Sequence, residues 1–126
     1  MPRDVIRTDA APAAIGPYSQ AIQAADGFVF CSGQIPLTAR GEMVTGDIGT
    51  QTRQCLENVT AVLAAAGLEL ANVVKTTVFL SSMDHFSAMN AVYGEFFSVD
   101  PPARSTVAVA GLPKGADVEI EVVAHP

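Results

Sequence analysis

An arginine and two glutamates in the last quarter of the chain are the side chains best suited to chemistry. Arg104 opens a valine-rich run, and Glu119 and Glu121 alternate with apolar residues in the run 117–124. A guanidinium holds a planar carboxylate well because it donates two parallel hydrogen bonds. A glutamate desolvated at a subunit interface has a raised pKa and can exchange protons with water or a substrate nitrogen near neutral pH. Arg104 is therefore a candidate carboxylate-binding residue, and Glu119 a candidate acid or base.

Both candidates also have an ordinary interpretation. Arginines at strand ends are usually solvated or paired structurally. The two glutamates fit the wet side of an alternating strand, which is the commoner cause of such a pattern. The residues alone leave these alternatives open.

The segments around these side chains predict two strands. Residues 104–110 and 117–124 are rich in Val and Ile, and the linker 111–116 contains Gly and Pro. We read them as a hairpin-like pair. Such a pair would bring Arg104 and Glu119 near one polar surface of an otherwise apolar sheet.

Hydrophobic patterns along the rest of the chain predict further strands and two helices. The Asp26-Gly27 dipeptide tolerates the positive φ of a tight hairpin turn. Strands interleaved with two helices favour a single α+β domain over residues 1–126, with a mixed sheet and both helices on one face. The expected elements are an extended segment at 4–8, strands at 19–25, 28–34 and 73–80, and helices at 47–66 and 83–97.

Ser32 and Gly33 interrupt the second strand of the predicted hairpin. Both residues weaken strand packing, so the backbone must either approach another group closely at this point or form a bulge. The two interpretations have equal weight, and the first makes Gly33 a candidate binding position.

Composition favours an oligomer. Hydrophobic residues make up 49% of the chain and charged residues 16%, so some apolar surface is expected to lie between subunits. The sequence offers no third helix for the second face of the sheet. Burial against neighbouring copies would cover that face.

Charge and motifs argue against several classes of protein. The net charge of -6 and scattered basic residues exclude the electrostatic pattern of a nucleic-acid binder. No apolar run approaches the roughly 20 residues that span a bilayer, and the start lacks signal-peptide features, so we expect a cytoplasmic protein without membrane contact.

The remaining reactive side chains do not form a recognisable cofactor site. His85 and His125 are isolated, and no phosphate-binding glycine loop or zinc-ligand cluster is present in the sequence, so no metal and no other cofactor is expected. Cys31 and Cys55 lack metal-ligand spacing and are expected to be buried free thiols.

Several motifs together resemble the RidA family of enamine and imine deaminases. The resemblance runs nearly end to end, and its most specific block combines 102–107, 112–116 and 118–121. It is also carried by Gly16-Pro17-Tyr18-Ser19-Gln20, Ser32-Gly33-Gln34-Ile35-Pro36, Asn58-Val59 and Val74-Lys75-Thr76-Thr77-Val78.

The resemblance implies a chorismate-mutase-like protomer that assembles as a homotrimer with a central barrel and with sites between subunits. It places a carboxylate-binding residue at Arg104 and catalytic roles at Arg104, Glu119 and Tyr18. The position two residues after Arg104 is cysteine in several relatives and Thr106 here, which excludes a thiol-dependent mechanism. The implied substrate-binding residues are Arg104, Tyr18, Ser32, Gly33, Asn90 and Thr106.

The implied reaction is the hydrolysis of 2-iminobutanoate and 2-iminopropanoate, or their enamine tautomers, to 2-oxoacids and ammonia. Arg104 would clamp the substrate carboxylate while Glu119 and backbone groups near Thr106 hold the attacking water. Two alternatives stay open. The chain could deaminate another enamine acid of the aminoacrylate or aminomuconate type, or it could be a non-enzymatic ligand-binding or chaperone-like protein.

Overall fold

A computed structural model describes residues 2–126 and contains one six-stranded mixed sheet with two α-helices. Short 3-10 turns precede β4, α2 and β6. The elements are β1 (Arg3–Ile6), β2 (Ala21–Ala24), β3 (Val29–Gln34), α1 (Ile48–Ala65), β4 (Val73–Leu80), α2 (Phe86–Phe96), β5 (Ala103–Ala108) and β6 (Val118–Ala124).

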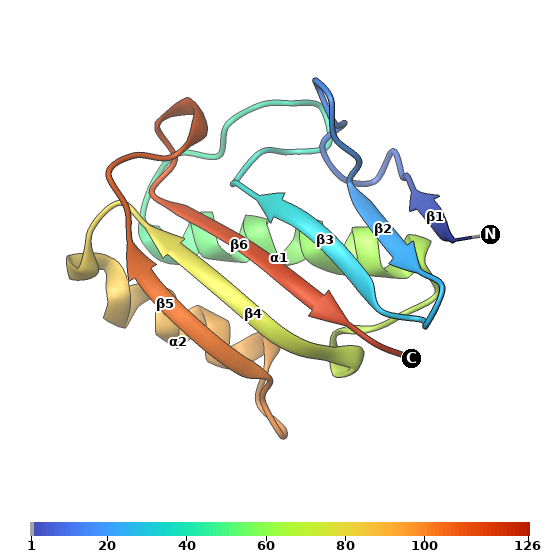
Figure 1. Cartoon of the computed structure of the whole chain (residues 1–126). Coiled ribbons are helices and arrows are strands. Elements are labelled where there is room, and N and C mark those ends of the chain that lie inside the picture. The colour runs from blue at the N-terminus through green and yellow to red at the C-terminus, as the bar shows by residue number, and fades with distance from the viewer. Residues whose placement is uncertain (1) are drawn as a thin grey trace.

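The sheet has the order β1-β2-β3-β6-β4-β5, which places β4 between the last two strands of the chain (Figure 1). β4 pairs with β5 in parallel and with β6 in antiparallel orientation. The predicted hairpin of 104–110 with 117–124 is therefore wrong. The two strands exist close to their predicted bounds but do not touch as a pair.

The connection through α2 explains this difference. A helix between two strands allows them to run parallel and adjacent, and here β4, α2 and β5 form such a unit. The chain then leaves β5 through a nine-residue segment, 109–117, with a 3-10 turn at Pro113–Gly115. This segment is long enough to cross the end of β4 and let β6 pair on its other side.

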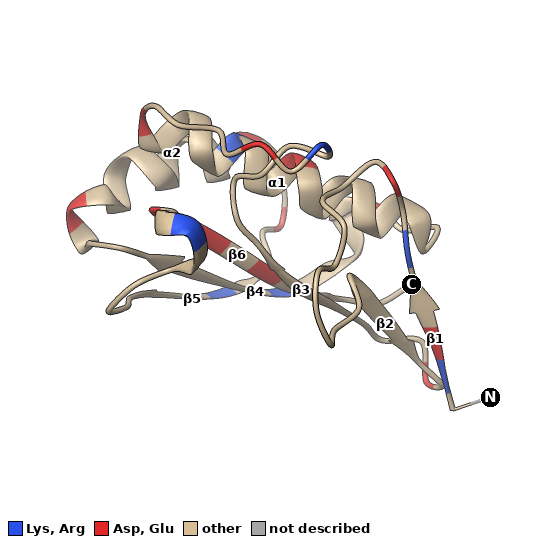
Figure 2. Ribbon diagram, turned by 90° about the horizontal axis from the view of Figure 1, so that it is seen from above, with Lys and Arg blue, Asp and Glu red and all other residues tan. Residues whose placement is uncertain are grey.

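The two helices lie on the same face of the sheet, as predicted (Figure 2). Asp47 caps the start of α1, because its side chain accepts a hydrogen bond from the Thr50 amide, and Gly67 follows the end of the helix with a φ of 76°. The core lies between the two helices and the sheet. Its largest fully buried side chains include Leu56, Leu63, Leu80, Met89 and Ile120.

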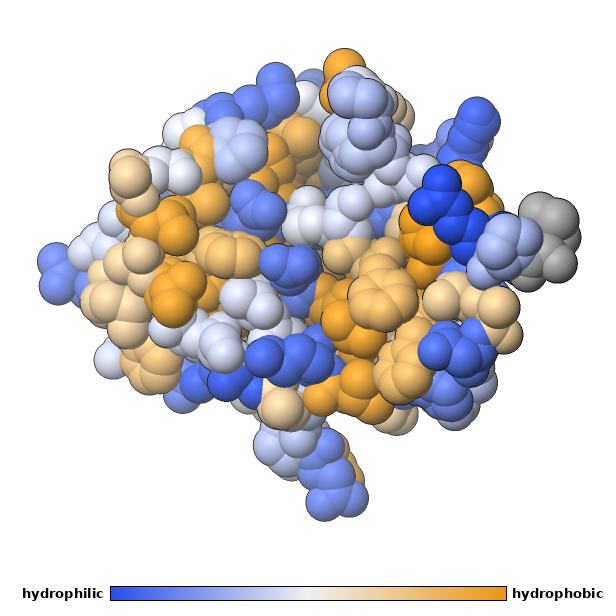
Figure 3. Space-filling model, in the orientation of Figure 1, coloured by the Kyte–Doolittle hydropathy of each residue, from blue (hydrophilic) through white to orange (hydrophobic). Residues whose placement is uncertain are grey.

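The opposite face of the sheet carries no helix and exposes apolar side chains. Phe30 is 50% exposed on β3 and Val107 is 42% exposed on β5. Figure 3 shows apolar patches interspersed with hydrophilic ones on this side of the molecule. The prediction of an uncovered sheet face is confirmed for the single chain.

Other local predictions also agree with the structure. The first hairpin turns at Asp26-Gly27, where Gly27 has a φ of 99°, and β4 spans the predicted 73–80. The helix predicted at 83–97 begins as a 3-10 turn at Met83–His85 before α2. Cys31 and Cys55 are buried and free. Within residues 2–126, every helix is too short or too polar to cross a bilayer.

The central position of β4 generates a prediction about stability. Val78 is fully buried in β4, whereas Val99 is 80% exposed after α2. Val78→Ala should lower the free energy of unfolding by about 2 kcal/mol or more, because it removes buried methyl groups and leaves a cavity. Val99→Ala, the matched control, should change it by less than about 0.5 kcal/mol. Urea titrations of both variants measure the difference, and equal losses would contradict this description of the core.

Candidate functional site

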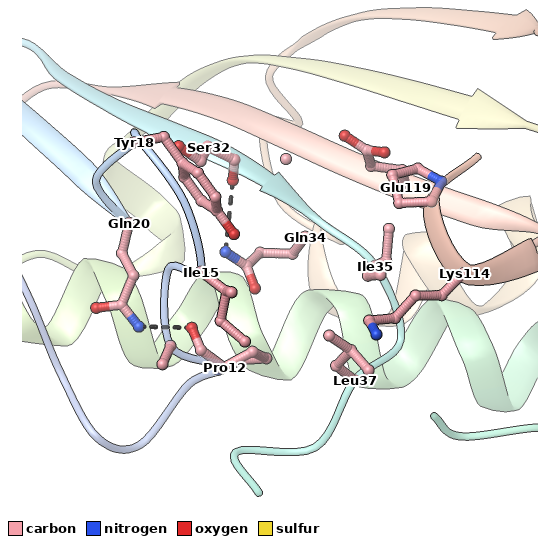
Figure 4. Close-up of a pocket in the computed structure, with 13 residues that line it drawn as sticks. Pro12, Ile15, Tyr18, Gln20, Ser32, Gln34, Ile35, Leu37, Lys114 and Glu119 are labelled. Carbon is pink, nitrogen blue, oxygen red and sulfur yellow. Dashed lines mark hydrogen bonds between the residues drawn. The ribbon is translucent and has the colours of Figure 1, made fainter. Parts of the chain in front are cut away.

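A pocket of about 540 Å³ opens beside the end of β3 (Figure 4). Polar groups enter it from three parts of the chain, and its remaining wall is apolar. The polar lining residues are Tyr18, Gln20, Ser32, Gln34, Lys114 and Glu119, and the apolar ones include Pro12, Ile15, Ile35 and Leu37.

The loop that carries Tyr18 is fixed by hydrogen bonds to buried polar groups. The Gln20 side-chain amide donates to the carbonyls of Thr8 and Pro12 at 3.0 and 2.8 Å, and its oxygen accepts from the Thr8 amide. The Ser32 hydroxyl donates to the Ser19 carbonyl at 2.6 Å. Ser32, predicted to bind substrate, therefore uses its hydrogen to join this loop to β3, while its oxygen retains lone pairs for a ligand.

Ser32 and Gly33 form a bulge, because the pairing register of β3 with β6 shifts between Cys31 and Gln34. A close approach occurs at the same point. A Cβ atom on Gly33 would overlap the Glu119 Oε2 and lie 2.9 Å from its Cδ. Both interpretations of the interrupted strand are thus correct, since the bulge brings a bare backbone against the Glu119 carboxyl group.

Glu119 is half-buried in this position. Desolvation is the main cause that raises the pKa of its carboxyl group, and the nearby Glu121 adds to the rise. A carboxyl group whose pKa is raised can both accept and return a proton closer to neutral pH. This electrostatic environment is the one predicted for an acid or base.

Lys114 brings a cation to the pocket from the turn between β5 and β6. Its φ of 56° is a left-handed conformation that non-glycine residues seldom adopt. The turn is held in place by Asp117, which accepts hydrogen bonds from Ser81 at 2.7 Å and Gln51 at 3.2 Å. These hydrogen bonds lower the pKa of Asp117. In Figure 4 the Lys114 side chain extends into the pocket.

Arg104 lies away from this pocket, at the edge strand β5. Its Nη1 donates a hydrogen bond to Asn90 Oδ1 at 2.7 Å. Its Cζ stands 4.7 Å from the centre of the Tyr93 ring and 5.5 Å from that of Phe86, both on α2. Within residues 2–126 it forms no salt bridge.

Thr106 is on the same face of β5 as Arg104, two residues farther along the strand. Its Oγ1 is buried and is the one such side-chain atom without a hydrogen-bond partner in the described part of the chain. Buried hydroxyl groups normally have a partner, so this oxygen is available to a water molecule or a ligand.

The sequence-predicted site residues thus fall into two groups. We call Arg104, Asn90 and Thr106 the arginine half-site, and the four residues in the pocket the glutamate half-site. The members of the glutamate half-site are Tyr18, Ser32, Gly33 and Glu119.

One protomer does not bring the two half-sites together. Arg104 is opposite Thr76 in β4, and Thr76 is opposite Val122 in β6, so these three side chains share the helix-covered face. Glu119 is three residues before Val122 and points to the other face. The expectation that Arg104 and Glu119 of one strand pair share a polar surface is wrong, because β4 separates the strands and their polar side chains face opposite ways.

Sequence reasoning missed several residues at these positions. Tyr93 and Phe86 lie within the predicted helix 83–97, but sequence reasoning did not connect them with Arg104. The spacing of Phe86, Asn90 and Tyr93, four and three residues apart, places them on one helix face and could have indicated a shared neighbour. Lys114 and Gln20 lie in motifs that carry the family resemblance, but no other feature of the sequence marked either of them as a site residue.

Metal-binding side chains do not gather in the part of the chain that the structure describes. No group of three or more His, Cys, Asp or Glu residues there could hold a metal ion.

Comparisons with known proteins extend over nearly the whole chain. Residues 8–126 match the family described as Endoribonuclease L-PSP. The 2-iminobutanoate/2-iminopropanoate deaminase of Mus musculus is 46% identical, over 97% of this chain and 90% of that protein. The matched range contains all residues of both half-sites.

Solved structures agree with this match. YyfA of Yersinia pestis, described as a protein of unknown function of the conserved Rid family, superposes with a TM-score of 0.94 at 49% identity and covers 98% of this chain and 99% of its own. E. coli TdcF with bound serine has a TM-score of 0.92 at 41% identity and covers 98% of each chain.

The raised pKa of Glu119 predicts a pH-dependent stability difference. A carboxyl group with a higher pKa in the folded than in the unfolded state favours folding while protonated, and this contribution is lost as the pH rises from its ordinary pKa of 4.5 through the folded value. Glu119→Gln cannot ionise. It should therefore be more stable than wild type at neutral pH, and the advantage should disappear at acidic pH.

Thermal melts between acidic and neutral pH measure this difference. Glu42→Gln, in an exposed loop, is the control and should follow the wild-type profile. A Glu119→Gln profile parallel to wild type over the whole range would show that Glu119 is not desolvated.

Proposed function

The chain belongs to the YjgF/RidA family, described as Endoribonuclease L-PSP, and on this premise we propose that it hydrolyses 2-imino acids and their enamine tautomers to 2-oxoacids and ammonia. The family includes enamine and imine deaminases. The proposed substrates are 2-iminobutanoate and 2-iminopropanoate. The observation that carries the proposal is Arg104, a guanidinium held by neutral groups, to which no carboxylate of the described residues 2–126 is bound.

Such a guanidinium suits the one group that these substrates share, the carboxylate beside the imine carbon. Two parallel hydrogen bonds to a carboxylate fix both its position and its plane. The E. coli relative TdcF has been solved with serine bound, an amino acid that also carries a carboxylate next to the nitrogen-bearing carbon. Arg104 would therefore orient the imine carbon for attack by water.

Glu119 is the proposed proton carrier. It accepts a proton from water as the water oxygen bonds to the imine carbon and the C=N electron pair moves to nitrogen. Glu119 returns that proton to nitrogen and then carries the proton of the new hydroxyl group to nitrogen as well. The C–N bond breaks, ammonia leaves with its electron pair, and the hydroxyl oxygen becomes the carbonyl oxygen of the 2-oxoacid. The raised pKa of Glu119 supports these transfers, because the group holds a proton at higher pH than an ordinary carboxyl group does.

Tyr18 shapes the substrate cleft beside Glu119 and can hydrogen-bond the substrate or the water. Asn90 holds Arg104, and Ser32 and Gly33 border Glu119. Backbone groups near Thr106 complete the site.

The site is proposed to form between copies of the chain, because Arg104 and Glu119 of one protomer face opposite ways. A second copy must supply the missing half-site. The exposed apolar side chains on the open sheet face fit burial in such a contact. A homotrimer with a central barrel, three equivalent clefts and a cytoplasmic location is the proposed form.

Other functions would give different results in substrate and binding assays. The apolar wall of Ile15, Ile35 and Leu37 also suits an enamine acid with another side chain, which substrate profiling would identify. The word endoribonuclease in the family description fits this chain poorly, since a net charge of -6 opposes binding to a polyanion. Binding of oxoacids without turnover would favour a non-enzymatic role.

Replacement of Arg104 tests the function directly. Arg104→Ala should lower kcat/KM at least about 100-fold, because the substrate carboxylate loses its charged hydrogen bonds. Arg104→Lys should recover only part of this loss, since an ammonium cannot donate in a planar fork. The assay generates the imine in place with an amino-acid oxidase and measures 2-oxoacid formation in competition with semicarbazide.

Arg53→Ala is a matched control for this test. Arg53 also donates to a side-chain oxygen, that of Glu95 at 2.8 Å, and lies 5.6 Å from the Phe96 ring, but it is on the outer surface of α1. Its replacement should leave kcat/KM near the wild-type value. Normal turnover by a folded Arg104→Ala variant would refute the role of Arg104, and no acceleration by wild type would refute these substrates.

Mixing two inactive variants tests whether the site lies between copies. Arg104→Ala and Glu119→Ala should each be inactive alone. After joint refolding at equal concentrations, about a quarter of the sites in a randomly mixed cyclic oligomer would combine an intact Arg104 with an intact Glu119 from a neighbour. Activity should rise accordingly. No recovery in demonstrably mixed oligomers would mean that both residues act within one chain.

A further inference from the structure

Tyr93 forms a buried surface directly against the Arg104 guanidinium. Its side chain is 5% exposed, and its ring centre is 4.7 Å from Arg104 Cζ. Phe86 adds a second ring at 5.5 Å. A guanidinium over an aromatic face is attracted by the negative charge density of the ring, and the attraction strengthens where water is excluded.

The Tyr93 ring is itself held in place. Its hydroxyl shares a hydrogen bond of 2.7 Å with the Thr76 hydroxyl, which is fully buried. Thr76 is the direct neighbour of Arg104 in the pairing of β4 with β5. The ring also packs on Phe97, with centres 4.8 Å apart. β4 therefore acts on Arg104 in two ways. It pairs with the strand that carries Arg104, and its Thr76 fixes the Tyr93 ring against which Arg104 lies.

Among the residues that the structure describes, these are the contacts of the guanidinium, and they leave one of its sides free. Nη1 donates to Asn90, and the rings contact the guanidinium without accepting its in-plane hydrogens. The hydrogens on Nε and Nη2 remain in the plane, with the parallel geometry that a carboxylate accepts. Asn90 and the rings are neutral, so they hold the group without cancelling its charge.

We propose that Tyr93 is a positioning residue for the reaction, which orients Arg104 so that its Nε–Nη2 edge faces the substrate carboxylate. This inference rests on the proposed function. It assigns Tyr93 an effect on carboxylate recognition in addition to its place in the core. Thr76 acts through Tyr93 by fixing the ring.

The test uses Tyr93→Leu, Tyr93→Phe and the control Phe96→Leu in the full chain. Tyr93→Leu removes the ring and should lower kcat/KM for 2-iminobutanoate about 10-fold, while Tyr93→Phe keeps the ring and should lower it about 3-fold or less. Phe96→Leu removes the ring beneath Arg53 on the same helix and should leave kcat/KM within about 2-fold of wild type.

The contact of the Tyr93 ring with Arg104 is measured separately by NMR of the arginine Nε–H groups. The Arg104 signal, assigned by its loss in Arg104→Lys, should be displaced by ring currents and should move in Tyr93→Leu. In Tyr93→Phe it should stay near its wild-type position. In Phe96→Leu only the Arg53 signal should move. A residue that serves packing alone would lower the melting temperature of Tyr93→Leu without the loss of kcat/KM that retention of the ring in Tyr93→Phe prevents.

The outcomes separate this inference from the proposed function. If folded Tyr93→Leu leaves kcat/KM unchanged, or if Phe96→Leu loses as much activity as Tyr93→Leu, the role of Tyr93 is overturned. If wild type does not hydrolyse the imines, the proposed function fails, while the NMR comparison still decides whether the Tyr93 ring lies against Arg104. If Tyr93→Leu does not fold, a displaced Arg104 signal in Tyr93→Phe together with unchanged turnover would also overturn it.

Discussion

The position of β4 in the sheet determines where the chemical groups lie. β4 pairs with β5 on one side and β6 on the other, so the strands that carry Arg104 and Glu119 are separated by a third strand. Side chains alternate between the two faces, and the observed register turns Arg104 to the helices and Glu119 to the open face. A shift of one residue in either pairing would reverse one of them. Full burial of Val78 and Ile120, which are opposite each other, fixes the register against such a shift.

This separation keeps the two charges from neutralising each other within a chain. An arginine beside a glutamate of the same protomer would form an ion pair, and the hydrogen-bond donors needed for a ligand would already be used. The structure instead gives Arg104 a neutral acceptor, Asn90, and two aromatic rings. Glu119 lies against the bare backbone of Gly33, where desolvation raises its pKa. Each group therefore retains the property that suits the proposed reaction.

The sequence predicted the local features because their causes are local. The Asp26-Gly27 turn, the extent of α1 and the extent of β4 depend on neighbouring residues, and all agree with the structure to within one residue. The pairing of β5 depends instead on where α2 returns the chain to the sheet, and neighbouring residues do not determine this. Arg104 could be identified by its chemistry alone. Its contact with Tyr93 could not be predicted, because it depends on how α2 packs against β5. At Ser32 and Gly33 the sequence left a bulge and a close backbone approach as alternatives. The structure has both, since the bulge brings the Gly33 backbone against Glu119.

The opposite orientation of Arg104 and Glu119 has a consequence for how activity would depend on protein concentration. If both groups are needed for one turnover, an isolated chain has two incomplete sites and no complete one. Dilution below the concentration at which the oligomer dissociates would then reduce activity more steeply than the amount of protein, and a newly made chain would become active only on meeting other copies. Assembly itself would act as the switch.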